Sequence, residues 1–165
     1  MKRSIILFLI AAFVTACGIY SFSGTSIAPD VSSITVFNFE NRAIRINPSL
    51  SNELTETLKD KYKRMTKLKI EGDKGDLIVD GQITGYETTS IAVTAQEVAA
   101  QNRLTVTVKV TFTNTKYPKE NFEKSFVAFE DFPSTTSLDA VEGRLVESIV
   151  DKLTEDIFNA TVANW

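Results

Sequence analysis

The most regular pattern in the chain is a strict alternation of apolar and polar residues between residues 104 and 113. The apolar positions are Leu104, Val106, Val108, Val110 and Phe112, and the positions between them are threonines and one lysine. A period of two puts the two kinds of side chain on opposite faces of a strand. The sequence therefore predicts a half-buried strand whose outer face is polar and rich in threonine.

Three further segments have the composition of strands. Residues 34–39 are β-branched and aromatic, residues 76–89 carry spaced apolar side chains after a Gly-Asp turn at 72–76, and residues 122–128 place aromatic residues on one side. The short connection at 114–121 predicts an antiparallel hairpin. Residues 90–101 are compatible with a longer strand, a short helical turn or a loop.

Two segments have the period of amphipathic helices. The first opens at Asn47 and Pro48, an N-cap residue followed by a favourable first helical residue, and its apolar stripe is Leu50, Leu54, Leu58, Tyr62 and Met65. The second opens near Thr136 and Asp139, which resemble a capping box. Its stripe is Leu138, Val141, Leu145, Ile149, Leu153 and Ile157.

The order strand, helix, three strands, helix predicts an α+β fold. Each helix must bury its stripe, and the apolar face of the sheet is the only large partner. We therefore expect a two-layer sandwich, with two helices packed on one face of a four-stranded, mostly antiparallel sheet. The RNA-recognition module has a different order and an aromatic, glycine-rich signature that this chain lacks.

The N-terminus has the parts of a bacterial lipoprotein signal. Lys2 and Arg3 precede an apolar run that is too short to span a membrane, and small residues lead to Cys17, the only cysteine. We expect a signal peptide at 1–16, lipidation of Cys17, a tether at 17–33 rich in Ser, Gly and Thr, and a single domain at 34–165. The alternative is a plain signal peptide that leaves Cys17 as a free thiol.

Composition excludes several kinds of chemistry. The chain has no histidine and one cysteine, so histidine-based triads and zinc sites cannot form, and neither a metal nor a cofactor is expected. The net charge of −3 argues against general nucleic-acid binding. The acid pairs Glu130–Asp131 and Asp139–Glu142 have no partner motif. We interpret them as surface residues, with a carboxylate-based hydrolase as the alternative.

Four stretches of the chain together resemble the lipopolysaccharide-assembly lipoprotein family. They are Cys17 to Gly24, Gly75 to Tyr86, Ala99 to Thr105, and Asp156 to Trp165. The resemblance implies a non-enzymatic outer-membrane lipoprotein, held on the periplasmic side or in a barrel lumen. It also implies that the protein plugs the lipopolysaccharide-export β-barrel, helps the barrel assemble and supports lipopolysaccharide delivery to the outer leaflet. The alternative is a lipid-anchored periplasmic binding or scaffold module of another envelope assembly.

Lipopolysaccharide presents phosphates and carboxylates, which favour arginine and lysine. Arg42 and Arg45, after the first strand, and Arg103, at the start of the regular strand, are our candidates for such contacts. The alternative is that they are ordinary surface cations. A denser run of cations from Lys59 to Lys69 falls at the end of the first helix, where it complements the helix dipole, and an anionic membrane surface is the second interpretation.

Overall fold

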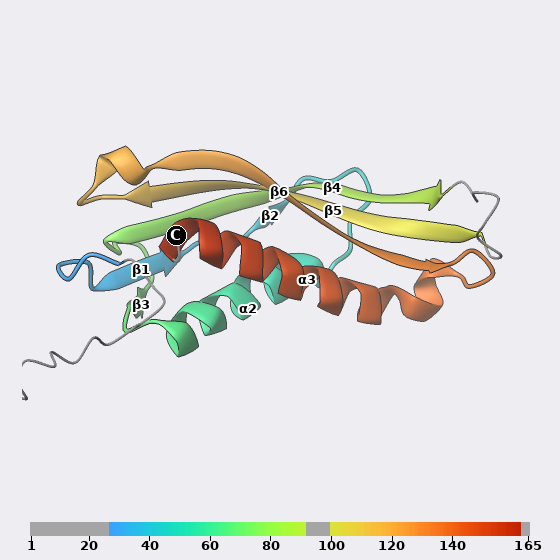
Figure 1. Ribbon diagram of the computed structural model, residues 1–165, viewed down its shortest axis with the longest axis horizontal. Coiled ribbons are helices and arrows are strands. Elements are labelled where there is room, and N and C mark those ends of the chain that lie inside the picture. Colours follow the sequence, from blue (N-terminus) through green and yellow to red (C-terminus); the bar gives the residue numbers. More distant parts are fainter. Residues whose placement is uncertain (1–26, 92–99, 163–165) are drawn as a thin grey trace, which may run out of the picture.

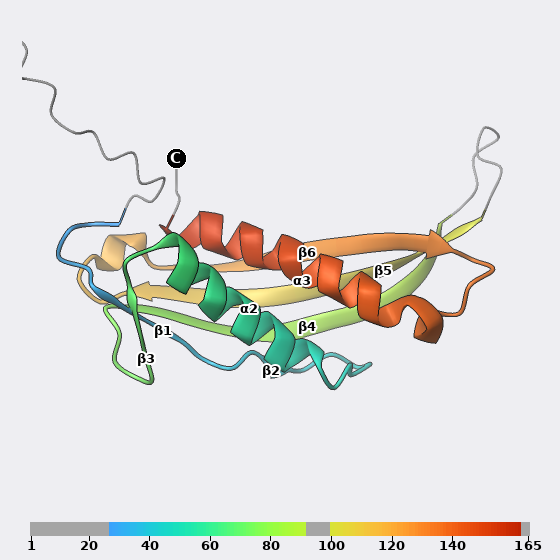
Figure 2. The ribbon, with the colours of Figure 1, turned by 90° about the horizontal axis from the view of Figure 1, so that it is seen from below.

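The computed structural model describes residues 27–91 and 100–162, which form a sheet and a helical layer (Figure 1). In chain order the elements are β1 Ser33–Val36, β2 Glu40–Asn41, α2 Leu50–Met65, β3 Lys69–Glu71, β4 Leu77–Ile91, β5 Gln101–Asn114, the 3-10 helix η2 Pro118–Glu120, β6 Phe122–Pro133 and α3 Leu138–Val162. The predicted α+β sandwich is confirmed, and Figure 2 shows both helices on the same face of the sheet.

The sheet has six strands, so the predicted number of four is wrong. Its order is β3-β1-β4-β5-β6, and β2 pairs with β4 beside this path. The two strands that the sequence did not predict, β2 and β3, have two and three residues, which is too short for an alternating pattern to appear. Both run parallel to the strand they pair with, as β1 does with β4.

Three long antiparallel strands make up most of the sheet. The β4–β5 ladder runs from Leu77 opposite Asn114 to Ile91 opposite Gln101, with a register shift between Ile83 and Gly85. The β5–β6 ladder runs from Gln101 opposite Pro133 to Phe112 opposite Phe122, which confirms the predicted hairpin. Residues 90 and 91 extend β4 and residue 101 opens β5, whereas residues 92–99 lie outside the described residues.

The first helix packs as predicted except at its last position. Leu50, Leu54, Leu58 and Tyr62 are fully buried, but Met65 is 59% exposed because the helix ends there. The helix begins at Leu50, and the Asn47 side-chain oxygen accepts hydrogen bonds from the amides of Ser49 and Leu50 at 3.0 and 3.1 Å. Asn47 therefore holds the amides at the start of the helix as predicted, but the helix begins later than the predicted Asn47 and Pro48, with Ser49 at the N-cap position.

The second helix closes the core against the first. The stripe positions from Leu145 to Ile157 are fully buried, and the centre of the Phe158 ring lies 5.4 Å from that of Tyr62, with the two rings tilted by 45°. The Tyr62 hydroxyl shares a 2.7 Å hydrogen bond with Thr161, and burial raises the pKa of Tyr62. Neither helix in the described part of the chain combines the length and apolar composition needed to cross a bilayer.

Gly81 in β4 makes room for a buried aromatic ring. A Cβ atom at this position would lie within 3.0 Å of three atoms of the Phe39 ring, and Phe39 is fully buried. Because close-packed cores do not yield to added atoms without strain, this glycine fixes how closely the segment after β1 approaches the sheet.

We predict that Gly81→Ala lowers the free energy of unfolding by about 1–3 kcal/mol, because the new methyl group would displace the Phe39 ring. Gly143→Ala is the matched control, since a Cβ at Gly143 meets nothing within 4 Å and lies in a helix, where alanine stabilises by about 0.5–1 kcal/mol. Urea unfolding of both variants measures the difference. Equal changes in the free energy of unfolding would show that the close contact with Phe39 does not determine the effect of Gly81→Ala.

Candidate functional site

Two of the three predicted arginines lie in the loop between β2 and α2. The amide of Arg42 donates to the carbonyl of Ile83 at 2.8 Å, which fixes the start of the loop on β4. The Arg42 guanidinium pairs with Glu40 at 2.8 Å. Arg45 lies 3.9 Å from the Asp139 carboxylate and 6.0 Å from the centre of the Tyr86 ring. The loop thus bridges the sheet and the start of α3.

The same loop exposes two large apolar side chains. Ile44 is fully exposed and Ile46 is 62% exposed, and they alternate with the two arginines. Exposed guanidinium groups beside exposed aliphatic groups match a ligand that has anionic and hydrocarbon parts. We call residues 42–46 the arginine loop.

The third predicted arginine is not part of this loop. Arg103 lies on β5 one position before the buried Leu104, so its side chain is on the sheet face opposite the helices. It makes a bidentate pair with Asp131 at 2.7 and 2.9 Å and stacks 3.7 Å from the centre of the Phe129 ring. The hydrogen bond from Arg103 holds the pKa of Asp131 below its usual value. Arg103 therefore already has an anionic partner.

This outer sheet face is not covered by either described helix, since both lie on the other side of the sheet (Figure 1). Along β5 and β6 its centre consists of Thr105 and Thr107 beside Val127, which is 54% exposed, and Phe129, which is 43% exposed. Ion pairs border this centre on both sides, Arg103 with Asp131 and Lys109 with Glu123. An apolar centre with a charge-compensated rim is the usual anatomy of a protein interface.

The other side of β6 is a free edge within the described residues, since the sheet order ends at this strand. The ammonium group of Lys152 on α3 donates to the backbone carbonyl of Phe129 at 3.0 Å and pairs with Glu130 at 2.7 Å. It occupies one of the carbonyl groups that a neighbouring strand would otherwise bind.

The adjacent acids Glu130 and Asp131 do not form a carboxylate pair. Glu130 interacts with Ser148 and Lys152 of the helix layer, and Asp131 binds Arg103 on the outer face. They therefore point to opposite sides of the strand and cannot act on one bond together. Within residues 27–91 and 100–162, no group of three acidic, histidine or cysteine side chains is placed to hold a metal ion.

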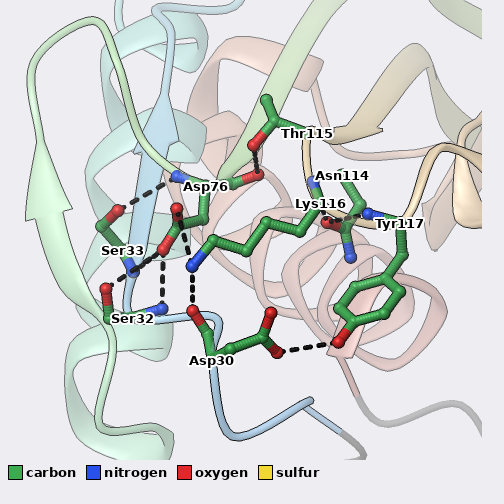
Figure 3. A network of polar contacts seen from close by, with 8 residues as sticks. All are labelled: Asp30, Ser32, Ser33, Asp76, Asn114, Thr115, Lys116 and Tyr117. Carbon is green, nitrogen blue, oxygen red and sulfur yellow. Dashed lines mark hydrogen bonds and ion pairs between the residues drawn. The ribbon is translucent and has the colours of Figure 1, made fainter.

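A polar cluster that the sequence pattern does not predict joins the start of the domain to the residue that precedes β4 (Figure 3). The Asp76 carboxylate accepts hydrogen bonds from the amides of Ser32 and Ser33, at 2.8 and 3.2 Å, and from the Ser32 hydroxyl at 3.1 Å. The hydroxyl of Ser33 accepts from the Asp76 amide at 3.0 Å in return. The hydrogen bond from the Ser32 backbone amide, together with the Lys116 ammonium group 3.3 Å away, lowers the pKa of Asp76 to about 2.

The turn after β5 completes this cluster, which we call the N-terminal clasp. Lys116 donates to the Asp30 carbonyl, and the Tyr117 hydroxyl donates to the Asp30 carboxylate at 2.8 Å. The side-chain oxygen of Asn114 accepts from the amides of Lys116 and Tyr117, which fixes the turn. Residues 30–33, from the predicted tether, are thus held against two distant parts of the chain.

The sequence signal for the clasp is the Gly75-Asp76 pair, which by itself predicts only a turn. A Cβ atom at Gly75 would lie 2.6 Å from the Thr35 amide nitrogen, so this glycine allows the loop to reach β1. Only the register of β1 against β4 shows that Asp76 then faces the two serines, 43 and 44 residues earlier in the chain.

With this arrangement established, comparison with known proteins identifies the family. The LptE family model, described as lipopolysaccharide-assembly, matches residues 31–161. The chain belongs to this family of outer-membrane lipoproteins that take part in lipopolysaccharide assembly. No curated protein sequence matches the chain.

Solved structures share the fold. A minor lipoprotein from Acinetobacter baumannii matches with a TM-score of 0.50 and 12% identity, over 77% of this chain and 89% of that one. A protein from Xanthomonas campestris of the DUF330 family matches with a TM-score of 0.53 and 11% identity, over 79% of this chain and 85% of that one. At such identities the likeness shows the architecture alone.

The predicted signal peptide at 1–16, Cys17 and the tether up to residue 26 lie outside the described residues. The described remainder of the predicted tether, residues 27–33, packs against the domain, where Val31 is buried. The predicted boundary at residue 34 falls within β1, which begins at Ser33.

We predict that Asp76→Asn lowers the free energy of unfolding by about 1–2 kcal/mol at neutral pH, the usual contribution of charge-assisted hydrogen bonds. Because the folded pKa is about 2, below the value near 3.9 in an unfolded chain, this contribution is complete above pH 5 and disappears as the pH falls towards 2. Denaturant unfolding across this range should show the two proteins converging in acid. Asp73→Asn in the same turn is the control, and a similar loss there would contradict the role of the clasp.

Proposed function

We propose that this protein is a non-enzymatic plug for the lipopolysaccharide-export β-barrel of the outer membrane, that it helps the barrel to assemble, and that it supports lipopolysaccharide delivery to the outer leaflet. The match to the LptE family carries the proposal. Lipidation at Cys17 would hold the domain on the periplasmic side of the membrane or in the barrel lumen, and more than one acyl chain would make this anchoring stable.

The outer sheet face supports a protein partner of this kind. A barrel lumen is polar and wet, and the threonines and compensated ion pairs of β5 and β6 suit such surroundings. Val127 and Phe129 offer the small apolar centre that a stable contact needs. A sheet with both helices on one side can therefore present its other side to the barrel wall.

The arginine loop supports contact with lipopolysaccharide. Arg42 and Arg45 offer donors to phosphate groups, and Ile44 and Ile46 offer aliphatic surface to acyl chains. Arg103 remains a candidate on the outer face, where its remaining donors are free of the bidentate pair with Asp131. Two separate surfaces would thus serve the lipid and the barrel.

The barrel contact is tested by co-purification from outer membranes in mild detergent. We predict that the wild-type chain recovers the lipopolysaccharide-export barrel and that Val127→Glu lowers the yield at least about tenfold, because a charge at the apolar centre of an interface is costly to desolvate. Val127→Thr is the control of similar shape. A wild-type chain that recovers a different envelope assembly would favour the alternative function, and no partner at all would refute both.

The lipid contact is tested on the mature chain without its lipid, residues 17–165 with Cys17→Ala. We predict that Arg42→Glu with Arg45→Glu weakens lipopolysaccharide binding at least about tenfold, since each reversal replaces a phosphate donor with a repelling charge. Lys119→Glu with Lys124→Glu makes the same charge change at exposed sites far from the arginine loop. Fluorescence titration measures both affinities, and equal losses would assign the effect to net charge.

The role of Arg103 needs a separate variant because its reversal alone would break a structural pair. Exchanging the two charges, Arg103→Asp with Asp131→Arg, keeps an ion pair between β5 and β6. We predict that this exchange leaves lipopolysaccharide affinity within about threefold of wild type if Arg103 is structural. A larger loss, at unchanged thermal stability, would show that Arg103 contacts the lipid itself.

A further inference from the structure

We propose that one end of the domain is a docking surface for the anionic phospholipid headgroups of the membrane leaflet that carries the anchor. The surface, which we call the basic end, consists of Lys63, Arg64, Lys67 and Lys69 and the groove beside them. It lies where α2 ends and β3 begins, next to the first described residues of the chain (Figure 2). Its placement near the membrane rests on the proposed lipidation of Cys17, but its chemistry does not.

The charge of the basic end is opposite to that of the whole protein. Residues 60–71 carry five cations and two anions, in a chain of net charge −3. Lys59 and Lys61, just before the cluster, are paired with Glu56 and Glu155. In the described part of the chain, none of the four cations of the basic end takes part in a salt bridge.

Stabilisation of the helix explains only half of this cluster. Lys63 and Arg64 lie in the last turn of α2, where cations complement the helix dipole. Lys67 and Lys69 come after the helix, beyond the range of that effect. The Thr66 hydroxyl donates to the Tyr62 carbonyl at 2.7 Å and accepts from the Leu68 amide at 3.1 Å, so the backbone that carries Lys67 is held in place.

The groove adds an apolar component to this charge. It has a volume of about 420 Å³, and its walls include Ile27, Val31, Met65 and Leu68, with Arg64 and Lys67 at its sides. Met65, the stripe position that the core leaves 59% exposed, belongs to this groove. A membrane interface presents phosphates above acyl chains, so cations beside a small apolar groove match it in both respects.

The path of the chain brings this end of the domain to the bilayer. Ser33 pairs with Lys69 in the β1–β3 ladder, and the N-terminal clasp fixes residues 30–33 beside it. Ile27 comes ten positions after Cys17 in the sequence, and ten residue steps span at most about 35 Å when fully extended. A lipid on Cys17 therefore keeps the basic end close to the headgroups, and it leaves the start of α3, at the opposite end of the domain, farther from them (Figure 2).

The expected effect is moderate and sensitive to salt. Each cation near an anionic membrane surface increases the partitioning of a protein onto that membrane about fivefold, and this attraction is screened as the ionic strength rises. Two cations of the basic end should thus contribute at least about tenfold. Such a contact would act together with the acyl chains, as second signals do in other anchored proteins.

The test measures co-sedimentation of the mature chain with Cys17→Ala, which has no lipid of its own. We expect binding to vesicles that contain phosphatidylglycerol, loss of most binding at about 1 M salt, and weak binding to vesicles of phosphatidylcholine alone. Arg64→Gln with Lys67→Gln should lower the affinity at least about tenfold. Lys124→Gln with Arg144→Gln makes the same charge change at exposed positions on β6 and α3, away from the basic end, and should keep the wild-type affinity.

Equal losses in the two double variants, or equal binding to neutral vesicles, would overturn the proposal. Arg64→Gln with Lys67→Gln should keep the wild-type melting temperature, because both side chains are exposed. Met65→Gln is a second test, which should lower the affinity for vesicles without a change of charge. If the basic-end variant instead loses affinity only for lipopolysaccharide micelles, the surface binds that lipid and not phospholipid. The vesicles contain no barrel and no lipopolysaccharide, so failure here leaves the proposed function untouched.

Discussion

The whole structure depends on the burial of two helical stripes against one face of a single sheet. The fully buried side chains of α2, such as Leu54 and Tyr62, meet those of α3 and the inner positions of β4 and β5. Burial of this apolar surface is the main favourable term in folding. Both helices cover the same face of the sheet. The opposite face carries threonines and ion pairs instead of a helical layer, and it is therefore available for a partner.

The protein thus has three distinct surfaces. The outer sheet face is suited to another protein, the arginine loop to an amphiphile, and the basic end to a charged membrane surface. The clasp around Asp76 fixes residues 30–33 and therefore the place where the chain enters the domain.

The sequence predicted what depends on local periodicity. The alternation around Val108 and the stripe around Leu145 each determine one element, and the need to bury them determines the layers. It could not predict β2 and β3, which are too short for a pattern, nor the Arg103–Asp131 pair, which requires the β5–β6 register. Arg42 and Arg45 lie in one loop, as the sequence predicts, because they are close together in the chain.

The edge of β6 that has no neighbouring strand among the described residues has a consequence for aggregation. This twelve-residue strand pairs with β5 on one side only, so its other edge can recruit a strand from a neighbour, including one from an identical chain. The Lys152 ammonium on the Phe129 carbonyl obstructs such growth, since an incoming strand would lose that acceptor and bury a charge. The Lys152 contact thus protects this edge of the described sheet against pairing with a second chain.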